Sequence, residues 1–147
     1  MKTMWNDADR EELLARIDRL SDDATARWGK MTAGAMLAHI TEAMKMAVGE
    51  LVCKPKKMPI RFFPLKQLIV YVFPFPKSAP TAKELLEGSD TPPARSKAEL
   101  RRLIALFVSK KGQKQWPSHP AFGALSEKAW GALGYKHLDH HLRQFGV

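Results

Sequence analysis

The chain has 147 residues, of which 45% are hydrophobic; this is enough for one ordinary domain with a sizeable core and too apolar for a disordered protein. Its single cysteine, Cys53, excludes an internal disulfide and any metal site built from several cysteines. The formal net charge of +9 would attract nucleic acid or anionic lipid. The lysines, however, are spread along the chain, and we find no helix-turn-helix, zinc-finger or RNP pattern among them. Nucleic-acid binding is therefore not the expected main function.

The chain opens with an amphipathic pattern. A first helix is predicted from about residue 7 to residue 20, with Asn6 or Asp7 as its N-cap. Its apolar stripe consists of Leu13, Leu14, Ile17 and Leu20. The first residues carry acids at once and no apolar signal core, so we expect no secretory leader. Together with the single cysteine, this favours a cytoplasmic protein.

A second helix is predicted over residues 33 to 48. The hydroxyl of Thr32 can accept a hydrogen bond from the first turn, so Thr32 is the expected cap. Gly49 is the expected stop, because glycine readily adopts the left-handed conformation that ends many helices.

Residues 50 to 95 hold most of the prolines and are predicted to form a long crossover. A short apolar helix is expected near residues 65 to 73, with a further turn near residues 82 to 87. The letters LIVYVF also have strand propensity, but a lone strand would have no partner to pair with. We therefore expect helical and irregular structure in the crossover.

The longest apolar stretch, residues 59 to 76, is interrupted by charged residues and prolines, so it does not predict a transmembrane helix. If its segment from Phe62 to Phe75 did not pack on the rest of the protein, it would expose more hydrophobic surface than a monomer usually tolerates. We predict that this segment either covers one end of the bundle or lies in a homodimer interface.

The third helix is predicted to begin after Ser96, with Glu99 completing a capping box, and to run to about residue 110 before Gly112. Its core face would contain Leu100, Leu103, Ile104, Phe107 and Val108. The fourth helix is predicted after Ser126, over residues 127 to 144. Four amphipathic helices with one long crossover predict an all-α, four-helix bundle that forms a single domain over residues 1–147.

His39 is predicted to point into this bundle. At about 100° per residue, methionines and alanines flank it on both sides, whereas Thr41 and Lys45 lie on the far side of the helix. Burying an imidazole among such side chains is unfavourable unless its nitrogens have partners. A bound metal together with an acceptor for the other nitrogen would provide both partners.

Two further histidines lie near the end of the fourth predicted helix. His137 and His141 are four residues apart, which places both imidazoles on one helix face and within reach of a single metal ion. The spacing alone is a weak signal, because histidines near a C-terminus also complement the helix dipole. A lone inward histidine is likewise more often an ordinary core residue. The combination of all three inside one bundle favours a metal site.

Two other histidines are candidates for a supporting role. His140 is rotated away from His137 and His141 on the helix. We interpret it as a residue that either contacts one of the metal-binding side chains or faces solvent. His119 lies in the loop WPSHPAFG and could either line the mouth of the site or cap a turn between two prolines.

Three neutral histidines without an identifiable inward carboxylate suit zinc, nickel or a similar divalent ion. Three protein ligands leave a coordination position for water or substrate, which is typical of a catalytic site. Cys53 lies outside every motif and is interpreted as incidental.

The residues around these histidines resemble a known superfamily. This is the DinB-like superfamily, the damage-inducible bundle proteins of bacteria. Its second helix is similar to residues 28 to 44, WGKMTAGAMLAHITEAM. Its last helix is similar to residues 119 to 146, HPAFGALSEKAWGALGYKHLDHHLRQFG. The combination resembles a poorly characterised branch and carries no information about residues 50 to 95. The resemblance implies a bundle, often dimeric, with a divalent metal on His39, His137 and His141.

Characterised members of the superfamily include transferases that use a low-molecular-weight thiol such as bacillithiol or mycothiol, and others resemble glutathione-dependent isomerases or metal-dependent hydrolases. Many members have no known activity, so the resemblance carries over only the three histidines and no reaction. The first hypothesis for the function is a metal-dependent thiol S-transferase acting on small electrophiles, with the thiol as cosubstrate. The alternatives are a metal-dependent hydrolase and a non-catalytic metal-binding stress-response protein. A continuous basic groove with exposed aromatic residues would instead favour nucleic acid.

Overall fold

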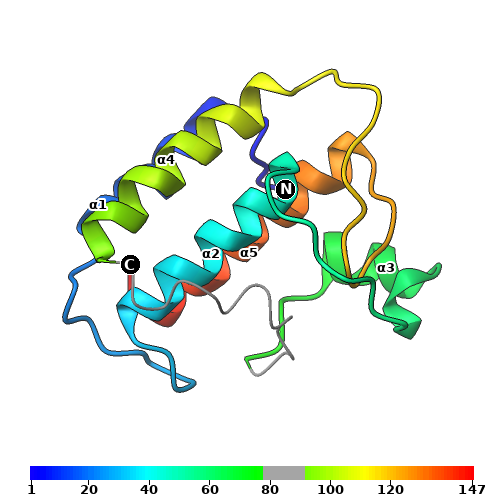
Figure 1. Ribbon diagram of the computed structural model, residues 1–147. Coiled ribbons are helices and arrows are strands. Elements are labelled where there is room, and N and C mark those ends of the chain that lie inside the picture. Colours follow the sequence, from blue (N-terminus) through cyan, green and yellow to red (C-terminus); the bar gives the residue numbers. More distant parts are fainter. Residues whose placement is uncertain (78–91) are drawn as a thin grey trace.

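The computed structural model describes residues 1–77 and 92–147, and over these residues the protein is all-α, as predicted. Four long helices form what we call the helical core: α1 (Asp7–Arg19), α2 (Ala33–Val48), α4 (Pro93–Ser109) and α5 (Glu127–Gln144) (Figure 1). The described residues contain no strand, and their one β-bridge joins His119 to Gly123. The turn predicted near residues 82 to 87 lies outside the described residues.

Side-chain caps fix the beginnings of three of these helices. Asn6, Thr32 and Ser126 each accept a hydrogen bond from the backbone N–H three residues ahead, at donor–acceptor distances of 3.0 to 3.2 Å. Gly49 ends α2 in the left-handed conformation, with φ of 87°. Because these caps are local, the predicted bounds of α2 and α5 match the structure, and α1 ends one residue earlier than predicted.

The predicted beginning of α4 is wrong. The helix begins at Pro93, three residues before the proposed capping residue Ser96. A proline suits the first helical position because its fixed φ is already helical and its missing N–H would have no partner there. Ser96 instead lies inside the helix and is buried against α2, where the Thr41 hydroxyl lies 3.5 Å from the Ser96 carbonyl oxygen. Glu99 pairs with Arg102 rather than closing a capping box.

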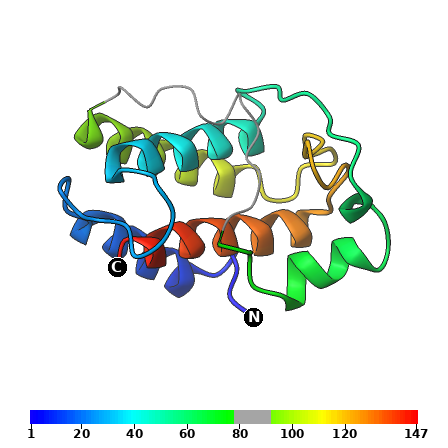
Figure 2. The same ribbon diagram turned by 90° about the horizontal axis from the view of Figure 1, so that it is seen from below.

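The four long helices share one hydrophobic core. Helix α2 packs on α4 and on α5, and α1 packs on the other sides of α5 and α4 (Figure 2). Ten residues that we predict in the core by periodicity are buried: Leu13, Ile17, Met36, Met44, Leu103, Ile104, Phe107, Trp130, Leu138 and Leu142. Leu14 and Val108, which the sequence also places on apolar helix faces, are only partly buried. Helix α2 is buried almost all round, so Thr41, on the side away from His39, faces α4 rather than solvent.

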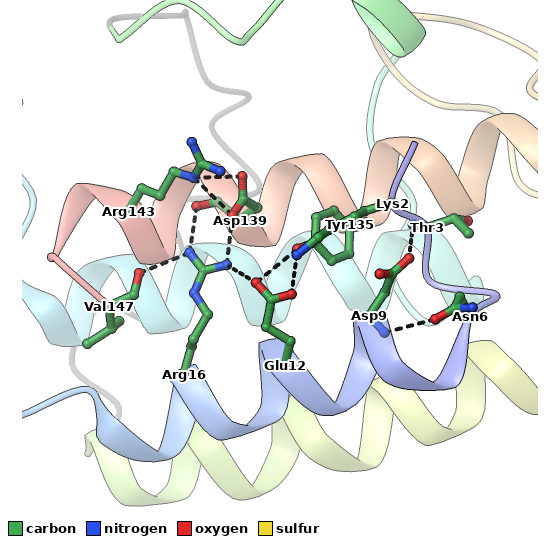
Figure 3. A network of polar contacts seen from close by, with 10 residues as sticks. All are labelled: Lys2, Thr3, Asn6, Asp9, Glu12, Arg16, Tyr135, Asp139, Arg143 and Val147. Carbon is green, nitrogen blue, oxygen red and sulfur yellow. Dashed lines mark hydrogen bonds and ion pairs between the residues drawn. The ribbon is translucent and has the colours of Figure 1, made fainter.

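A buried arginine joins α1 to α5 (Figure 3). Arg16 donates to the Asp139 carboxylate at 2.7 Å and to the backbone carbonyl of Val147 at 2.9 Å. Glu12, one turn before Arg16, lies 3.6 Å from the same guanidinium. Arg143 reaches Asp139 from the solvent side at 3.0 Å, with 71% of its side chain exposed. This network fixes the C-terminal half of α5 against α1.

The crossover packs beside α5 through short helical turns: the 3-10 turn η1 (Pro59–Arg61), helix α3 (Leu65–Gln67) and the π-helix η2 (Leu68–Val72). Val70 is buried, and Ile69, Tyr71 and Phe75 pack on the core. Lys136 of α5 donates to the carbonyl oxygens of Ile69 and Phe73, at 2.7 and 3.0 Å. One side of the predicted segment from Phe62 to Phe75 therefore packs on the helical core. A homodimer through this segment stays a prediction.

No helix in the described ranges combines the length and the apolar character needed to cross a membrane.

We expect Arg16→Met to lower the free energy of unfolding by about 2 kcal/mol, because it removes hydrogen bonds between charged groups at a buried position. Arg143→Met is the matched control: it removes an exposed partner of the same carboxylate and should cost less than about 0.5 kcal/mol. Urea denaturation of both variants measures the difference. Equal losses would show that Arg16 does not fix α5.

Candidate metal centre

Three histidines from two helices meet at the packed face between α2 and α5. His39, His137 and His141 each present one ring nitrogen, and these three atoms all lie within 4.8 Å of one another. The Nε2 atoms of His39 and His137 are 3.1 Å apart. Sequence reasoning chose these same three residues, and the group contains no carboxylate and no cysteine.

The two helices position the rings in different ways. His39 lies in the middle of α2 and is 4% exposed, so packing on every side fixes its ring. His137 and His141 are one turn apart on α5, with ring centroids 4.9 Å apart, and both are partly exposed. His39 is therefore the most buried member of the cluster, and His137 and His141 keep some exposure.

Gln144 determines which nitrogen of His141 carries the proton. The Gln144 side-chain N–H donates to the backbone carbonyl of Trp28 at 2.8 Å, so its amide oxygen faces the other way. That oxygen lies 3.0 Å from Nδ1 of His141. An amide oxygen only accepts, so Nδ1 must donate, and the lone pair of His141 is left on Nε2. A ligating histidine typically has such an acceptor on its second nitrogen.

Burial keeps the α5 histidines neutral at physiological pH. Loss of hydration lowers the pKa of His141 to about 3; repulsion from His39 acts in the same direction, and the bond to Gln144 opposes it. Burial, followed by repulsion from His141 and His39, also holds the pKa of His137 well below its usual range. Neutral imidazoles have a free lone pair, which is the form that binds a metal.

His119 caps a turn, which is one of the two roles that the sequence left open; that it lines the mouth of a metal site stays a prediction. Its Nδ1 accepts from the backbone N–H groups of Ala121 and Phe122, at 3.1 and 3.2 Å, which caps the turn between the two prolines. It also lines a small cavity of about 40 Å³ together with His137 and Trp130. Burial lowers the pKa of His119 to about 4.

His140 is not part of the group of three. Its ring lies edge-on to Trp28, with centroids 5.7 Å apart, and close to Phe75 at 5.9 Å. Burial lowers its pKa, and Asp139 opposes this shift. His140 therefore lies beside the cluster, packed between aromatic rings.

Sequence reasoning missed three residues that surround the histidines. Gln144 follows His141 by three positions, so helical spacing alone could have indicated it. Trp28 lies in the loop before α2, and Phe75 comes from the crossover with its ring 6.2 Å from that of His137. No local pattern identifies these two, because tertiary packing alone brings them to the site.

The donor set fits a divalent transition metal. Two nitrogens bound to a tetrahedral zinc ion at about 2.0–2.1 Å lie roughly 3.3 Å apart. The Nε2 atoms of His39 and His137 are close to that separation, and the lone pair of His141 faces the same group. Imidazole nitrogen is a good ligand for zinc, copper, iron or nickel. The three residues could therefore hold one such ion.

Comparison with known proteins places the whole chain in one family. The family model described as "Protein of unknown function (DUF1569)" matches residues 5–146, a range that includes all five histidines of the chain. Searches of curated proteins and of solved structures returned no match.

We expect His119 to make the stability of the metal-free protein depend on pH. Its folded pKa of about 4 lies below the unfolded value of 6.5, so the unfolded state binds more protons between these two values. The free energy of unfolding should therefore fall as the pH is lowered through this window, by about 2 kcal/mol between about pH 7 and about pH 5 from His119 alone.

The control for this prediction is His119→Asn, whose side-chain oxygen can accept the same backbone N–H groups but does not titrate. Urea denaturation in the presence of a chelator, at both pH values, gives the stability of each protein. The stability difference between wild type and variant should shrink at the lower pH. A difference that does not change with pH would mean that His119 keeps an ordinary pKa in the folded state.

Proposed function

The chain belongs to the DUF1569 family, and on this premise we propose that it is a divalent-metal-binding protein whose metal is held by His39, His137 and His141. We further propose that it has the DinB-like four-helix-bundle architecture, and that its reaction is the transfer of a low-molecular-weight thiol to a small electrophile. The convergence of three imidazole nitrogens within 4.8 Å of one another carries the metal proposal.

The electrostatics of the cluster support a bound cation. Three imidazole nitrogens at this spacing would repel one another if protonated, and burial already holds the pKa of His137 and of His141 far below neutrality. Between His39 and His137 the two Nε2 atoms face each other at 3.1 Å, so at most one proton fits between them. A divalent ion satisfies all the lone pairs at once.

Among the described residues the group contains no carboxylate, which favours chemistry with an anionic nucleophile. A divalent ion held by His39, His137 and His141 would keep its positive charge and would lower the pKa of a thiol or a water bound beside it. In thiol transfer the S–H proton leaves to solvent, the sulfur forms a bond to the electrophilic carbon, and the leaving group departs with its electron pair. His137 and His141 face the partly exposed side, where both reactants would enter.

Metal-dependent hydrolysis is the second candidate, and the size of the neighbouring cavity favours it. The cavity lined by His119, Trp130 and His137 has a volume of about 40 Å³, which holds water but not a thiol cosubstrate. The thiol would therefore have to approach from the solvent side of α5. A non-catalytic metal-binding protein is the outcome if neither reaction is found.

The purified protein, dialysed against zinc or nickel, should retain about one ion per chain. We expect His39→Ala, and the double variant His137→Ala with His141→Ala, to lose the ion, because one or two ligands are then missing. His140→Ala is the matched control: it removes a half-buried imidazole next to His141 that is not part of the group, and it should retain the ion. Elemental analysis by mass spectrometry gives the stoichiometry.

Gln144→Met adds a graded test. It removes the acceptor of His141 Nδ1 but none of the three ligands, so metal affinity should fall by about 10- to 100-fold rather than vanish. Circular dichroism shows that each variant remains helical. Full retention of the metal by a folded protein that lacks all three histidines would refute the metal centre.

The metal-loaded protein should accelerate the reaction of a chlorinated aromatic electrophile with bacillithiol, mycothiol or glutathione, and His39→Ala should remove this acceleration. Turnover of an ester panel without any thiol would assign hydrolysis instead. Failure of every thiol and ester, with the metal retained, would leave a non-catalytic metal-binding protein and contradict the transferase proposal.

A further inference from the structure

The crossover presents an apolar surface that faces away from the helical core. Between residues 62 and 73 of the crossover, five large hydrophobic side chains are exposed: Phe62 at 70%, Phe63 at 81%, Leu65 at 43%, Val72 at 64% and Phe73 at 52%. We call these five residues the apolar patch. The opposite side of the same turns is fixed to α5 through Val70 and Lys136, so the patch stands on an anchored element at one end of the core (Figures 1 and 2).

The sequence around the patch is strongly basic. Residues 51 to 77 contain six lysines and arginines and no aspartate or glutamate. The six cations are Lys54, Lys56, Lys57, Arg61, Lys66 and Lys77. Lys77 lies over the ring of Trp28, 4.9 Å from its centroid, so the positive charge that adjoins the patch in the sequence comes from the other five cations.

This combination argues against a second copy of the chain as the occupant. A symmetric dimer through the patch would place two acid-free basic segments against each other, and like charges across an interface repel. Nucleic acid matches the charge and could stack on the three phenylalanines, but it would leave the aliphatic side chains of Leu65 and Val72 without an apolar partner. An anionic lipid surface matches both features: its headgroups attract the lysines, and its acyl region receives the apolar side chains.

We propose that the apolar patch and the surrounding lysines dock the protein on the surface of membranes that contain anionic lipid. The segment lies in the interface without crossing it, with Phe62 and Phe63, its two most exposed aromatic residues, in the acyl boundary. Phe75, at the end of the same segment, contacts the rings of His137 and His140, so docking brings the membrane to the element that borders the histidine cluster.

Co-sedimentation with vesicles tests this proposal. The full-length protein should bind vesicles of mixed phosphatidylcholine and phosphatidylglycerol, bind phosphatidylcholine alone only weakly, and lose binding as salt is raised. Phe62→Ser combined with Phe63→Ser should weaken binding roughly tenfold or more, because two inserted rings are lost. Both side chains are mostly exposed, so the variant should fold normally, and circular dichroism checks this.

A pair of charge-reversal variants separates the patch from the net charge of the protein. Lys54→Glu with Lys57→Glu changes the basic segment, whereas Arg19→Glu with Lys30→Glu changes exposed cations around the loop between α1 and α2, at the opposite end of the core. Each substitution lowers the charge by two, so both double variants have a formal net charge of +5. The first should weaken binding roughly tenfold or more, and the second should change it far less.

Any of four results would overturn the proposal. One is wild-type protein that stays in solution with the anionic vesicles. Another is equal binding by wild type and the double serine variant. The third is a concentration-dependent dimer that dissociates in the double serine variant, seen by light scattering, which would assign the patch to a second copy. The fourth is competition by duplex DNA that depends on Phe62 and Phe63, which would assign the patch to nucleic acid.

Discussion

The ion pair between Arg16 and Asp139 holds α5 against α1 on the side of the helix that faces away from the histidines. Asp139 lies midway between His137 and His141 in sequence, so on a helix it faces away from both. Arg16 binds it at 2.7 Å from α1, and the same guanidinium holds the backbone carbonyl of Val147. Because α5 is fixed from behind, the two imidazoles are directed toward His39 without a loop or a disulfide to position them.

The net charge of the protein surface and the imidazoles of the histidine cluster would attract ligands of opposite charge. A formal net charge of +9 gives the surface a field that repels free cations, so the proposed metal would have to be held by short-range bonds to the three imidazoles. The same field attracts anions, and two of the proposed cosubstrate thiols, glutathione and bacillithiol, carry carboxylates. A neutral centre within a basic protein therefore suits a bound cation that works on an anionic or ionising substrate.

The sequence predicts most of the helices and the histidine cluster because both depend on local rules. Capping residues and the 3.6-residue period define α1, α2 and α5, and the i, i+4 spacing of His137 and His141 follows from the same period. The beginning of α4 was mispredicted because two local signals compete there, and Pro93 at the first helical position prevails over Ser96. The bond from Gln144 to Trp28 joins residues 116 positions apart, and Phe75 approaches His137 from the crossover. No periodicity encodes such contacts, which exist only once the helices have packed.

The crossover links the two surfaces on which function would depend. Its inner side supplies Val70 to the core and two carbonyl oxygens to Lys136, the residue directly before His137. Its outer side carries the apolar patch, and its last aromatic ring, Phe75, borders His137 and His140. The same short segment thus carries both the exposed apolar side chains and the ring that borders the histidine cluster.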